Sequence, residues 1–332
     1  PYIETYLDSF AGASYEGRLL FRTNSGGGAI HDYLKNRKDF VAPFHGNEFR
    51  LICDPDGINN LYKNLYQNFS INNSAITFER FYKFSILLTK IKGSVSDKRK
   101  KIFNNNSIEI ITNYLNKITY LEYNAMPQFQ YIGLNLFNKI LFKIRHGYFR
   151  RNINSINLFK MKLPIDEKNF LIETRKLIMK LCESNISIKN KNIILDQAAS
   201  FWHPDDYFKY FDDLKIIIIN RDPRSIFYSM LSRNSKSYPS SNVSDFVKWY
   251  KNIRNKQSKI NNKNIYFIQY ENFLKNHKKE SKKLNNFLKI SNKIKSDFDL
   301  ESSKKNILKA SEKLAIKDQN FIKHNLKDFL SW

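Results

Sequence analysis

Two arginines and a serine stand where a phosphate group could be bound. Arg221 directly follows an apolar run, and the Asp222-Pro223 pair after it is typical of a turn that begins a helix. Ser229 follows Arg221 by eight positions, about two helical turns. A guanidinium at the start of a helix and a hydroxyl on its inner face can therefore share one phosphate. The alternative is a purely structural turn, in which Asp222 caps the helix and Arg224 lies on the surface.

A glycine-rich loop near the start of the chain offers a second anion site. Residues 22–30 are Arg-Thr-Asn-Ser-Gly-Gly-Gly-Ala-Ile and open a helical pattern. Consecutive glycines let backbone N–H groups converge on an anion, the helix N-terminus adds a favourable dipole, and Ser25 adds a hydroxyl. The Gly-Lys-Ser/Thr ending of nucleoside-triphosphate loops is absent. A glycine turn that binds no ligand is the alternative.

Composition excludes several classes of protein. The chain has 332 residues, of which 42% are hydrophobic and 15% aromatic, too many for a disordered protein. Its two cysteines, Cys53 and Cys182, make neither a disulfide framework nor a metal-ligand spacing. No apolar run approaches the ~20 residues of a membrane span, and the first residues lack the pattern of a secretory signal. We therefore predict a cytoplasmic protein with no membrane span and no bound metal.

The formal net charge of +25 predicts an affinity for anions. Nucleic acid, nucleotides, acidic glycans and anionic membrane surfaces all fit such a field. The lysines are spread over many segments of a chain rich in Lys, Asn and Ile, a composition that an AT-rich genome also produces. Charge alone therefore leaves the partner open.

Short apolar runs followed by helical patterns predict the elements that position these residues. The predicted strands are 18–22, 192–196, 215–220 and 264–269, and the helices are 28–37, 224–233 and 271–288. Continuous, β-branched strands alternating with helices indicate an α/β fold with a parallel sheet covered on both faces. In such a fold the site lies at the carboxyl ends of the strands.

The pattern changes between about residues 75 and 185. Apolar residues such as Phe78, Phe81, Ile111 and Leu115 recur there at helical spacing, with no clear strand among them. We predict a mostly helical insertion over about 75–185 that covers the mouth of the site. It would belong to a single domain spanning residues 1–332.

The order of these motifs resembles the sulfotransferases that use 3′-phosphoadenosine-5′-phosphosulfate (PAPS), particularly bacterial ones. Besides the two anion motifs, the resemblance includes the run 266–274 with Phe287-Leu288, and the residues 302–307, Ser-Ser-Lys-Lys-Asn-Ile. Asp196-Gln197 stands where many bacterial members have Asp-Lys-Thr-Pro. The resemblance implies a P-loop-like, three-layer α/β sandwich with a parallel sheet.

The resemblance also implies a reaction and a set of nucleotide contacts. In-line transfer would move SO₃ from PAPS to an acceptor hydroxyl or amine and leave 3′,5′-ADP, with fixed amides and cations in place of a metal. One set of residues would hold the 5′-phosphosulfate, and another the 3′-phosphate. The first comprises Asn24, Ser25, Gly26, Gly27, Gly28 and Ala29, and the second Arg221 and Ser229 with Lys304 or Lys305.

Two positions depart from the family pattern. The residue before the loop's Ser-Gly is usually lysine or arginine and here is Asn24, while Gln197 replaces the lysine of the Asp-Lys-Thr-Pro pattern. Either Arg22, two residues before Asn24, or another cation would substitute for the missing one. The alternative is a protein that binds the nucleotide and transfers slowly or not at all.

The transfer also needs a base to take the acceptor's proton. Glu48 follows the first predicted helix, where several family members place a catalytic glutamate, and His45 or Arg50 could tune it. His45 and His203, the latter before a proline, are the other candidate bases. A structural salt bridge for Glu48 and a helix cap for His203 are the alternatives.

Two other functions and the identity of the acceptor stay open. A small-molecule kinase with an irregular phosphate loop would need the lysine and Mg²⁺-binding hydroxyl that are missing. A non-enzymatic polyanion- or nucleic-acid-binding protein fits the charge, but no nucleic-acid module is recognisable. Arg145, His146, Arg150 and Arg151 suit an acidic glycan, whereas the nearby Tyr and Phe suit a small hydroxylated metabolite.

Overall fold

The computed structural model describes ten stretches of the chain. These are residues 27–44, 48–90, 103–104, 106–125, 136–148, 159–188, 191–200, 202–232, 239–305 and 312–331. The predicted strand 18–22 and the first residues of the glycine-rich loop lie outside them.

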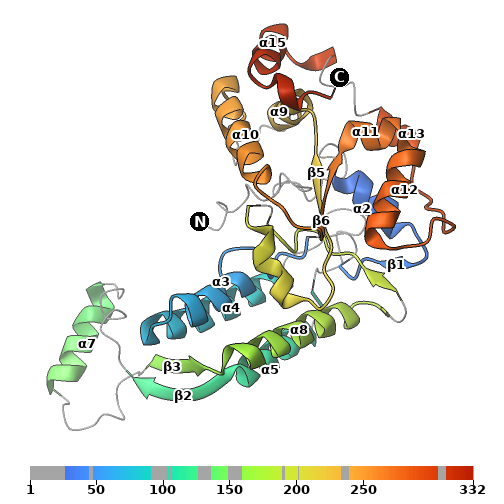
Figure 1. Cartoon of the computed structure of the whole chain (residues 1–332). Coiled ribbons are helices and arrows are strands. Elements are labelled where there is room, and N and C mark those ends of the chain that lie inside the picture. Colours follow the sequence, from blue (N-terminus) through green and yellow to red (C-terminus); the bar gives the residue numbers. More distant parts are fainter. Residues whose placement is uncertain are drawn as a thin grey trace.

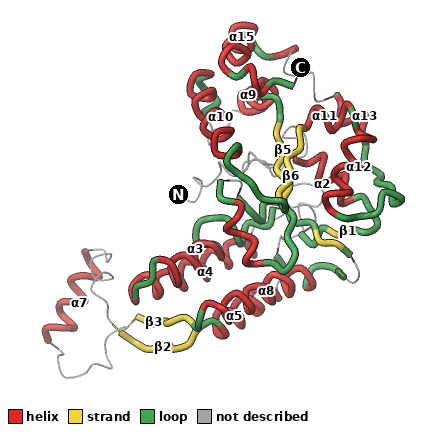
Figure 2. Tube along the Cα trace, viewed as in Figure 1, coloured by secondary structure: helices red, strands yellow, loops and turns green. Residues whose placement is uncertain are grey.

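Two pairs of parallel strands form the centre of the fold (Figures 1 and 2). β5 (Ile216–Asn220) pairs with β6 (Ile265–Gln269) along their whole lengths. β1 (Phe40–Val41) pairs with β4 (Asn192–Ile193). The chain is thus a mixed α/β protein with short parallel sheets, as predicted.

β4 is shorter than the predicted strand 192–196. The Ile194 N–H still donates to the Val41 carbonyl at 2.9 Å, but regular pairing ends there. It resumes as an isolated parallel bridge between Glu48 and Asp196, where the Phe49 N–H donates to the Asp196 carbonyl at 2.6 Å. The two segments therefore stay hydrogen-bonded beyond the ends of β1 and β4, and this places Glu48 beside Asp196.

Helices follow β5 and β6 as the sequence predicts, whereas β1 was not predicted. α9 (Pro223–Ser232) follows β5, and α2 (Gly27–Lys35) forms at the predicted helix 28–37 and precedes β1. The predicted helix 271–288 is divided into α11 (Tyr270–Lys275) and α12 (His277–Leu288), because Asn276 has φ −110° and ψ 41°. The other elements of this half of the chain are η5 (Pro204–Tyr210), α10 (Val243–Gln257), α13 (Leu300–Lys304), α15 (Ile316–Asn325) and η6 (Lys327–Phe329).

These helices lie on two sides of the β5–β6 pair (Figure 1). On one side, Ile253 of α10 packs on the strands in a buried cluster with Ile218 and Ile265. α9 and α15 join α10 through a further buried cluster that includes Phe227. On the other, α2, α11 and α12 pack on the strands through another cluster that includes Ile219 and Phe273. Both faces of this sheet are therefore covered, as the continuous apolar strands predict.

The predicted insertion contains helices and one unpredicted sheet. The antiparallel strands β2 (Thr119–Ala125) and β3 (Phe159–Pro164) pair between the helices, whereas the sequence analysis expected no strand here. Most of β2 is exposed, so it lacks the apolar run by which a strand is recognised. The helices of this region are α4 (Ile71–Lys90), α5 (Asn106–Lys117), α7 (Leu136–Tyr148) and α8 (Glu167–Glu183).

The largest buried cluster joins this region to the rest of the protein. α4, α5 and α8 pack against α3 (Ile58–Tyr62), η3 (Lys63–Gln67) and η5 through aromatic side chains such as Phe81, Phe170 and Tyr210. The helices of the predicted insertion thus share a core with segments that flank β1 and β4. Among the described residues, no helix combines the length and apolar character that crossing a membrane requires.

Candidate functional site

Arg221 is a buried cation at the carboxyl end of β5. Its residue is 4% exposed. The guanidinium carbon lies 5.0 Å from the ring centroid of Tyr270, and Nε lies 4.0 Å from Glu271 Oε1. Burial lowers the pKa of Arg221, while Tyr270 and Glu271 act in the opposite direction. Because a guanidinium stays protonated in proteins, the end of β5 holds a poorly hydrated positive charge.

Asp222 caps the following helix and binds the second arginine. Its Oδ1 accepts from the Arg224 backbone N–H at 2.9 Å and from Arg224 Nε at 3.0 Å, while Oδ2 accepts from Arg224 Nη2 at 2.8 Å. Asp222 is fully buried and Arg224 is 6% exposed. The structural alternative is therefore right about the cap and wrong about Arg224, which is held inside the protein by a bidentate ion pair.

Glu271 joins the ends of β5 and β6. Its Oε1 accepts from the Asp222 backbone N–H at 2.9 Å, and its Oε2 accepts from Gln269 Nε2 at 2.8 Å. Burial raises the pKa of Glu271, although Arg221 and these hydrogen bonds lower it. The carboxylate thus fixes the turn that carries Arg221 relative to β6.

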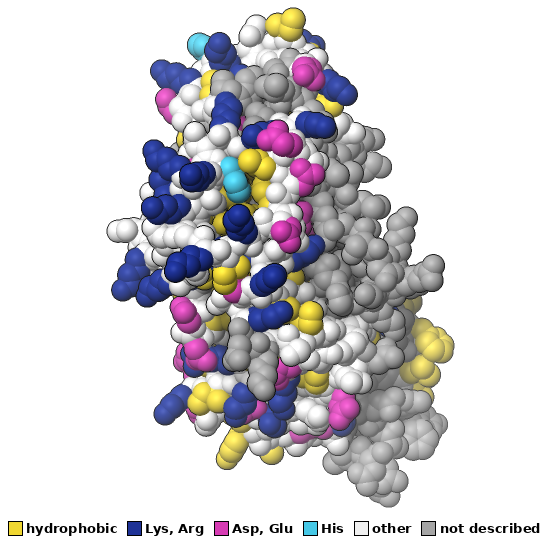
Figure 3. Space-filling view, turned by 90° about the vertical axis from the view of Figure 1, so that its right-hand side faces the viewer, with side chains coloured by type: hydrophobic (Ala, Val, Ile, Leu, Met, Phe, Trp, Pro, Cys, Tyr) yellow, Lys and Arg dark blue, Asp and Glu magenta, His cyan; other side chains and the backbone are white. Residues whose placement is uncertain are grey.

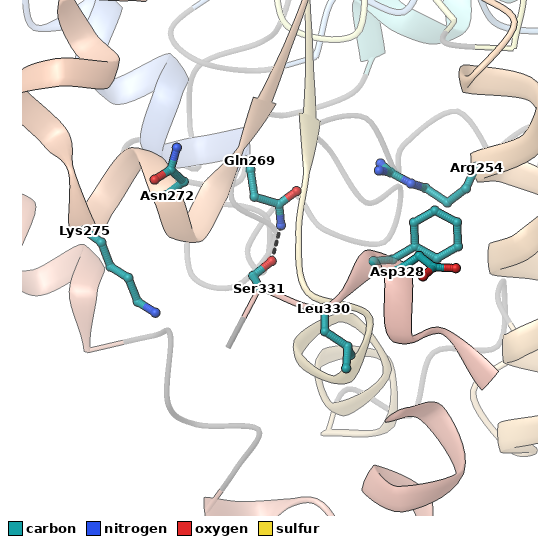
Figure 4. A pocket seen from close by; sticks show the side chains of 8 residues that line it. Arg254, Gln269, Asn272, Lys275, Asp328, Leu330 and Ser331 are labelled. Carbon is teal, nitrogen blue, oxygen red and sulfur yellow. Dashed lines mark hydrogen bonds between the residues drawn. The ribbon is translucent and has the colours of Figure 1, made fainter. Parts of the chain in front are cut away.

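A segment near residue 331 contacts this network, and Figure 4 shows Ser331 of this segment beside Gln269. The Ser331 N–H donates to Asp222 Oδ2 at 2.9 Å, and Gln269 Nε2 also donates to Ser331 Oγ. A pocket of about 230 Å³ lies beside it, lined by Arg254, Gln269, Asn272, Lys275 and residues 328–331. Neither Arg221 nor Ser229 lines this pocket, so it is separate from the predicted phosphate site.

Two serines of α9 lie one helical turn apart on a buried face. Ser225 is 1% exposed and Ser229 is 8% exposed. Within the described part of the chain, the buried Oγ of Ser225 has no hydrogen-bond partner. Leaving a buried hydroxyl unsatisfied costs about 1–3 kcal/mol, which a ligand acceptor would recover. The sequence analysis missed Ser225, although its position midway between Arg221 and Ser229 puts it on the same helix face.

The segment with Lys304 packs near Arg221 but as a helix. The Tyr270 hydroxyl donates to the Ser303 carbonyl of α13 at 3.3 Å, which brings α13 next to the ring beneath Arg221. Lys304 itself pairs with Glu301 at 2.7 Å, and Lys305 is exposed. Figure 3 views the molecule from the side on which α11, α12 and α13 lie in Figure 1, and lysines and arginines are scattered over this face. Anions would therefore be attracted to it.

Glu48 lies in a second buried group of charges, at the ends of β1 and β4. Its residue is 6% exposed, and Arg50 Nη1 lies 3.6 Å from its Oε2. Arg50 Nε also pairs with Asp54 Oδ2 at 2.6 Å. Burial raises the pKa of Asp54, with Arg50 opposing it. Arg50 therefore lies between two carboxylates and limits the freedom of both.

Gln197 adds an amide donor to this group. It has a left-handed φ of 53°, and its carbonyl accepts from Cys53 Sγ at 3.0 Å. Among the described residues, its buried Nε2 finds no hydrogen-bond acceptor. Gln197, which stands where the family pattern has lysine, is thus an unsatisfied donor directly after Asp196, the last residue of the predicted strand 192–196.

Several predicted site residues are not brought into either group. His203 is exposed and immediately precedes η5, without a side-chain capping bond. Gly27 and Gly28 begin α2, and Ala29 is buried in it. Four further candidates, Arg22, Asn24, Ser25 and Gly26, lie outside the described residues, as does His45.

Comparison with known families supports the resemblance drawn from the motifs. Residues 141–293 match the model of the sulfotransferase family. The match contains β5, Arg221, Ser229 and Glu271, but not α2, Glu48 or Lys304. No curated protein and no solved structure matches the chain. The sulfotransferase assignment is confirmed over the matched residues, and it supports sulfuryl transfer in general.

Proposed function

We propose that this protein, whose residues 141–293 match the model of the sulfotransferase family, transfers a sulfuryl group from PAPS to an acceptor hydroxyl or amine. The observation that carries the proposal is that a buried cation and a buried hydroxyl without a hydrogen-bond partner both lie at the carboxyl end of β5. Arg221 follows the strand directly, and Ser225 lies in the first turn of the next helix. Both groups fit a phosphate.

The 3′-phosphate of the nucleotide would be held by Arg221 and the two serines of α9. A phosphate oxygen accepts hydrogen bonds from both a guanidinium and a hydroxyl. It would also replace part of the hydration that burial removes from the Arg221 guanidinium. Lys304 or Lys305 would add charge at the edge of this site, since α13 touches Tyr270.

The sulfuryl end of the nucleotide would face Glu48 and the glycine-rich residues. In the proposed step, the acceptor oxygen or nitrogen forms a bond to sulfur while the bond between sulfur and the bridging phosphate oxygen breaks. Glu48 takes the acceptor's proton, and 3′,5′-ADP leaves. Gly26, Gly27 and Gly28 with Arg22 would stabilise the leaving phosphate, and the free donor of Gln197 suits a nearby oxygen.

Arg221→Ala should lower the affinity for 3′,5′-ADP by roughly tenfold to a hundredfold, since a charge-assisted phosphate contact contributes about 1.5–3 kcal/mol. Calorimetric titration in EDTA measures this without a metal. Lys248→Ala, an exposed cation of α10, changes the net charge equally and should bind normally. Unchanged affinity in folded Arg221→Ala would make Arg221 a structural partner of Glu271. A preference for ATP with Mg²⁺ would favour a kinase.

Ser225→Ala should separate ligand binding from stability. Removing an unsatisfied buried hydroxyl should leave the melting temperature unchanged or raise it slightly. The same change should weaken 3′,5′-ADP binding by about fivefold to tenfold, because a hydrogen bond to a charged group is lost. Ser232→Ala, which removes a hydroxyl bonded to the Ser229 carbonyl, is the matched control and should not weaken binding. A clear loss of stability with normal binding would argue against a ligand contact.

A further inference from the structure

α7 carries an apolar face that the described protein leaves exposed. Leu136 is 76% exposed, Phe137 68%, Ile140 49% and Ile144 53%. Leu136, Ile140 and Ile144 recur every four residues, so they share one face of the helix, and Phe137 lies at its margin. A helix of a globular protein normally buries such a face against its own core.

The helix also stands apart from the rest of the molecule. It lies beyond the far end of the β2–β3 pair, on the opposite side from the β5–β6 sheet and its helices (Figure 1). Two further apolar side chains, Tyr120 at 78% and Leu121 at 45% exposure, are on β2. Both lie at the end of β2 that adjoins α5, so the apolar face of α7 is a separate surface at the tip of the arm.

The charged residues of α7 are all basic. α7 contains no Asp or Glu, and Lys139 and Lys143 follow the same four-residue spacing beside the apolar face. From 123 to 165 the sequence has seven Lys and Arg and no Asp or Glu. The nearest acid, Glu122, pairs with Lys160 at 2.8 Å and with Lys162 at 3.0 Å. A partner with negative charge and an apolar interior would complement this surface.

We propose that α7 docks on an anionic lipid surface. The apolar face would enter the interface while Lys139 and Lys143 meet lipid phosphates, the arrangement of amphipathic helices that lie in the membrane plane. The helix has 13 residues, about 20 Å of length, too short to cross a bilayer core of about 30 Å. An interfacial position is thus the one its length and charge allow. This inference does not depend on sulfuryl transfer.

Vesicle co-sedimentation of the full chain tests the proposal. Vesicles that contain phosphatidylglycerol should bind the protein at least tenfold more strongly than pure phosphatidylcholine, and added salt should weaken that binding. Replacing Leu136, Phe137 and Ile140 together by Ser should reduce it by tenfold or more. Lys139→Gln with Lys143→Gln should also reduce it by about tenfold. Ile316→Ser on α15 is the matched control, because Ile316 is 76% exposed like Leu136.

Two kinds of result would overturn the proposal. One is equal sedimentation with both vesicle types, or anionic binding that neither α7 variant weakens. The other is a concentration-dependent dimer in analytical ultracentrifugation that the triple Ser variant abolishes, which would assign the face to a second copy of the chain. Each variant should keep wild-type 3′,5′-ADP binding or melting temperature, so a loss of vesicle binding cannot come from unfolding.

Discussion

Glu48→Gln should lower the rate of sulfuryl transfer by about 10²–10⁴-fold, the usual contribution of a positioned general base. The substitution preserves the shape of this buried side chain, and Arg50 keeps its closer pair with Asp54 at 2.6 Å, so the protein should stay folded. Affinity for 3′,5′-ADP should stay nearly intact, because the proposed 3′-phosphate site is at β5 whereas Glu48 is bridged to Asp196 beyond β4. Single-turnover rates with PAPS, together with calorimetry, separate the two effects.

Retention of the carboxylate provides an independent readout. Glu48→Asp should keep more of the rate than Glu48→Gln, because it keeps a group that can take the acceptor's proton. His203→Ala is the matched control, and it should be mild because His203 is exposed at the start of η5. If the His203 variant loses most of its rate while Glu48→Gln keeps near-normal turnover, Glu48 is a structural partner of Arg50 and the assignment of the base is wrong.

The β5 site was predictable because its signals are local. The run Ile216–Asn220 is continuously apolar before its last residue, and β6 has the same length and register. Arg221 and Ser229 are fixed relative to each other by one turn and one helix, so their sequence spacing sets their geometry. Ser225 could have been found by the same reasoning, since it shares that helix face.

The contacts that complete the site could not be predicted, because they join distant segments. Tyr270 lies beneath the Arg221 guanidinium, and Glu271 lies beside it. Both come directly after β6, at least 49 positions later in the sequence than Arg221. Sequence spacing gives no information on which ring will lie under a guanidinium. The same holds for the hydrogen bond from the Ser331 N–H to Asp222, because the two residues are 109 positions apart in the sequence.

The β2–β3 arm was missed for a different reason. A strand is recognised by an apolar run or by alternation that buries one face. Thr119–Ala125 has its exposed residues in succession, so neither signal is present. α7, at the end of this arm, was found as helical only as part of a larger region, and its exposure depends on where the arm places it.

Asp222→Ala should destabilise the protein by about 3–5 kcal/mol, because it leaves the buried Arg224 guanidinium without its carboxylate. Arg224 is 6% exposed and its contacts with Asp222 are bidentate. The Ser331 N–H and the cap of α9 lose the same acceptor. Urea unfolding should show the change as a lower midpoint. Glu79→Ala, which removes an exposed pair with Lys83, should cost under about 1 kcal/mol.

A double-mutant cycle identifies the cause of that loss. If the cost comes from an uncompensated buried charge, then Arg224→Met should relieve much of it when combined with Asp222→Ala. The double variant should then be more stable than Asp222→Ala alone. If the two losses simply add, the cost comes from the cap and the Ser331 contact rather than the ion pair. Arg221 is unchanged in every variant, so those that stay folded should retain 3′,5′-ADP binding, and this separates the supporting network from the proposed phosphate site.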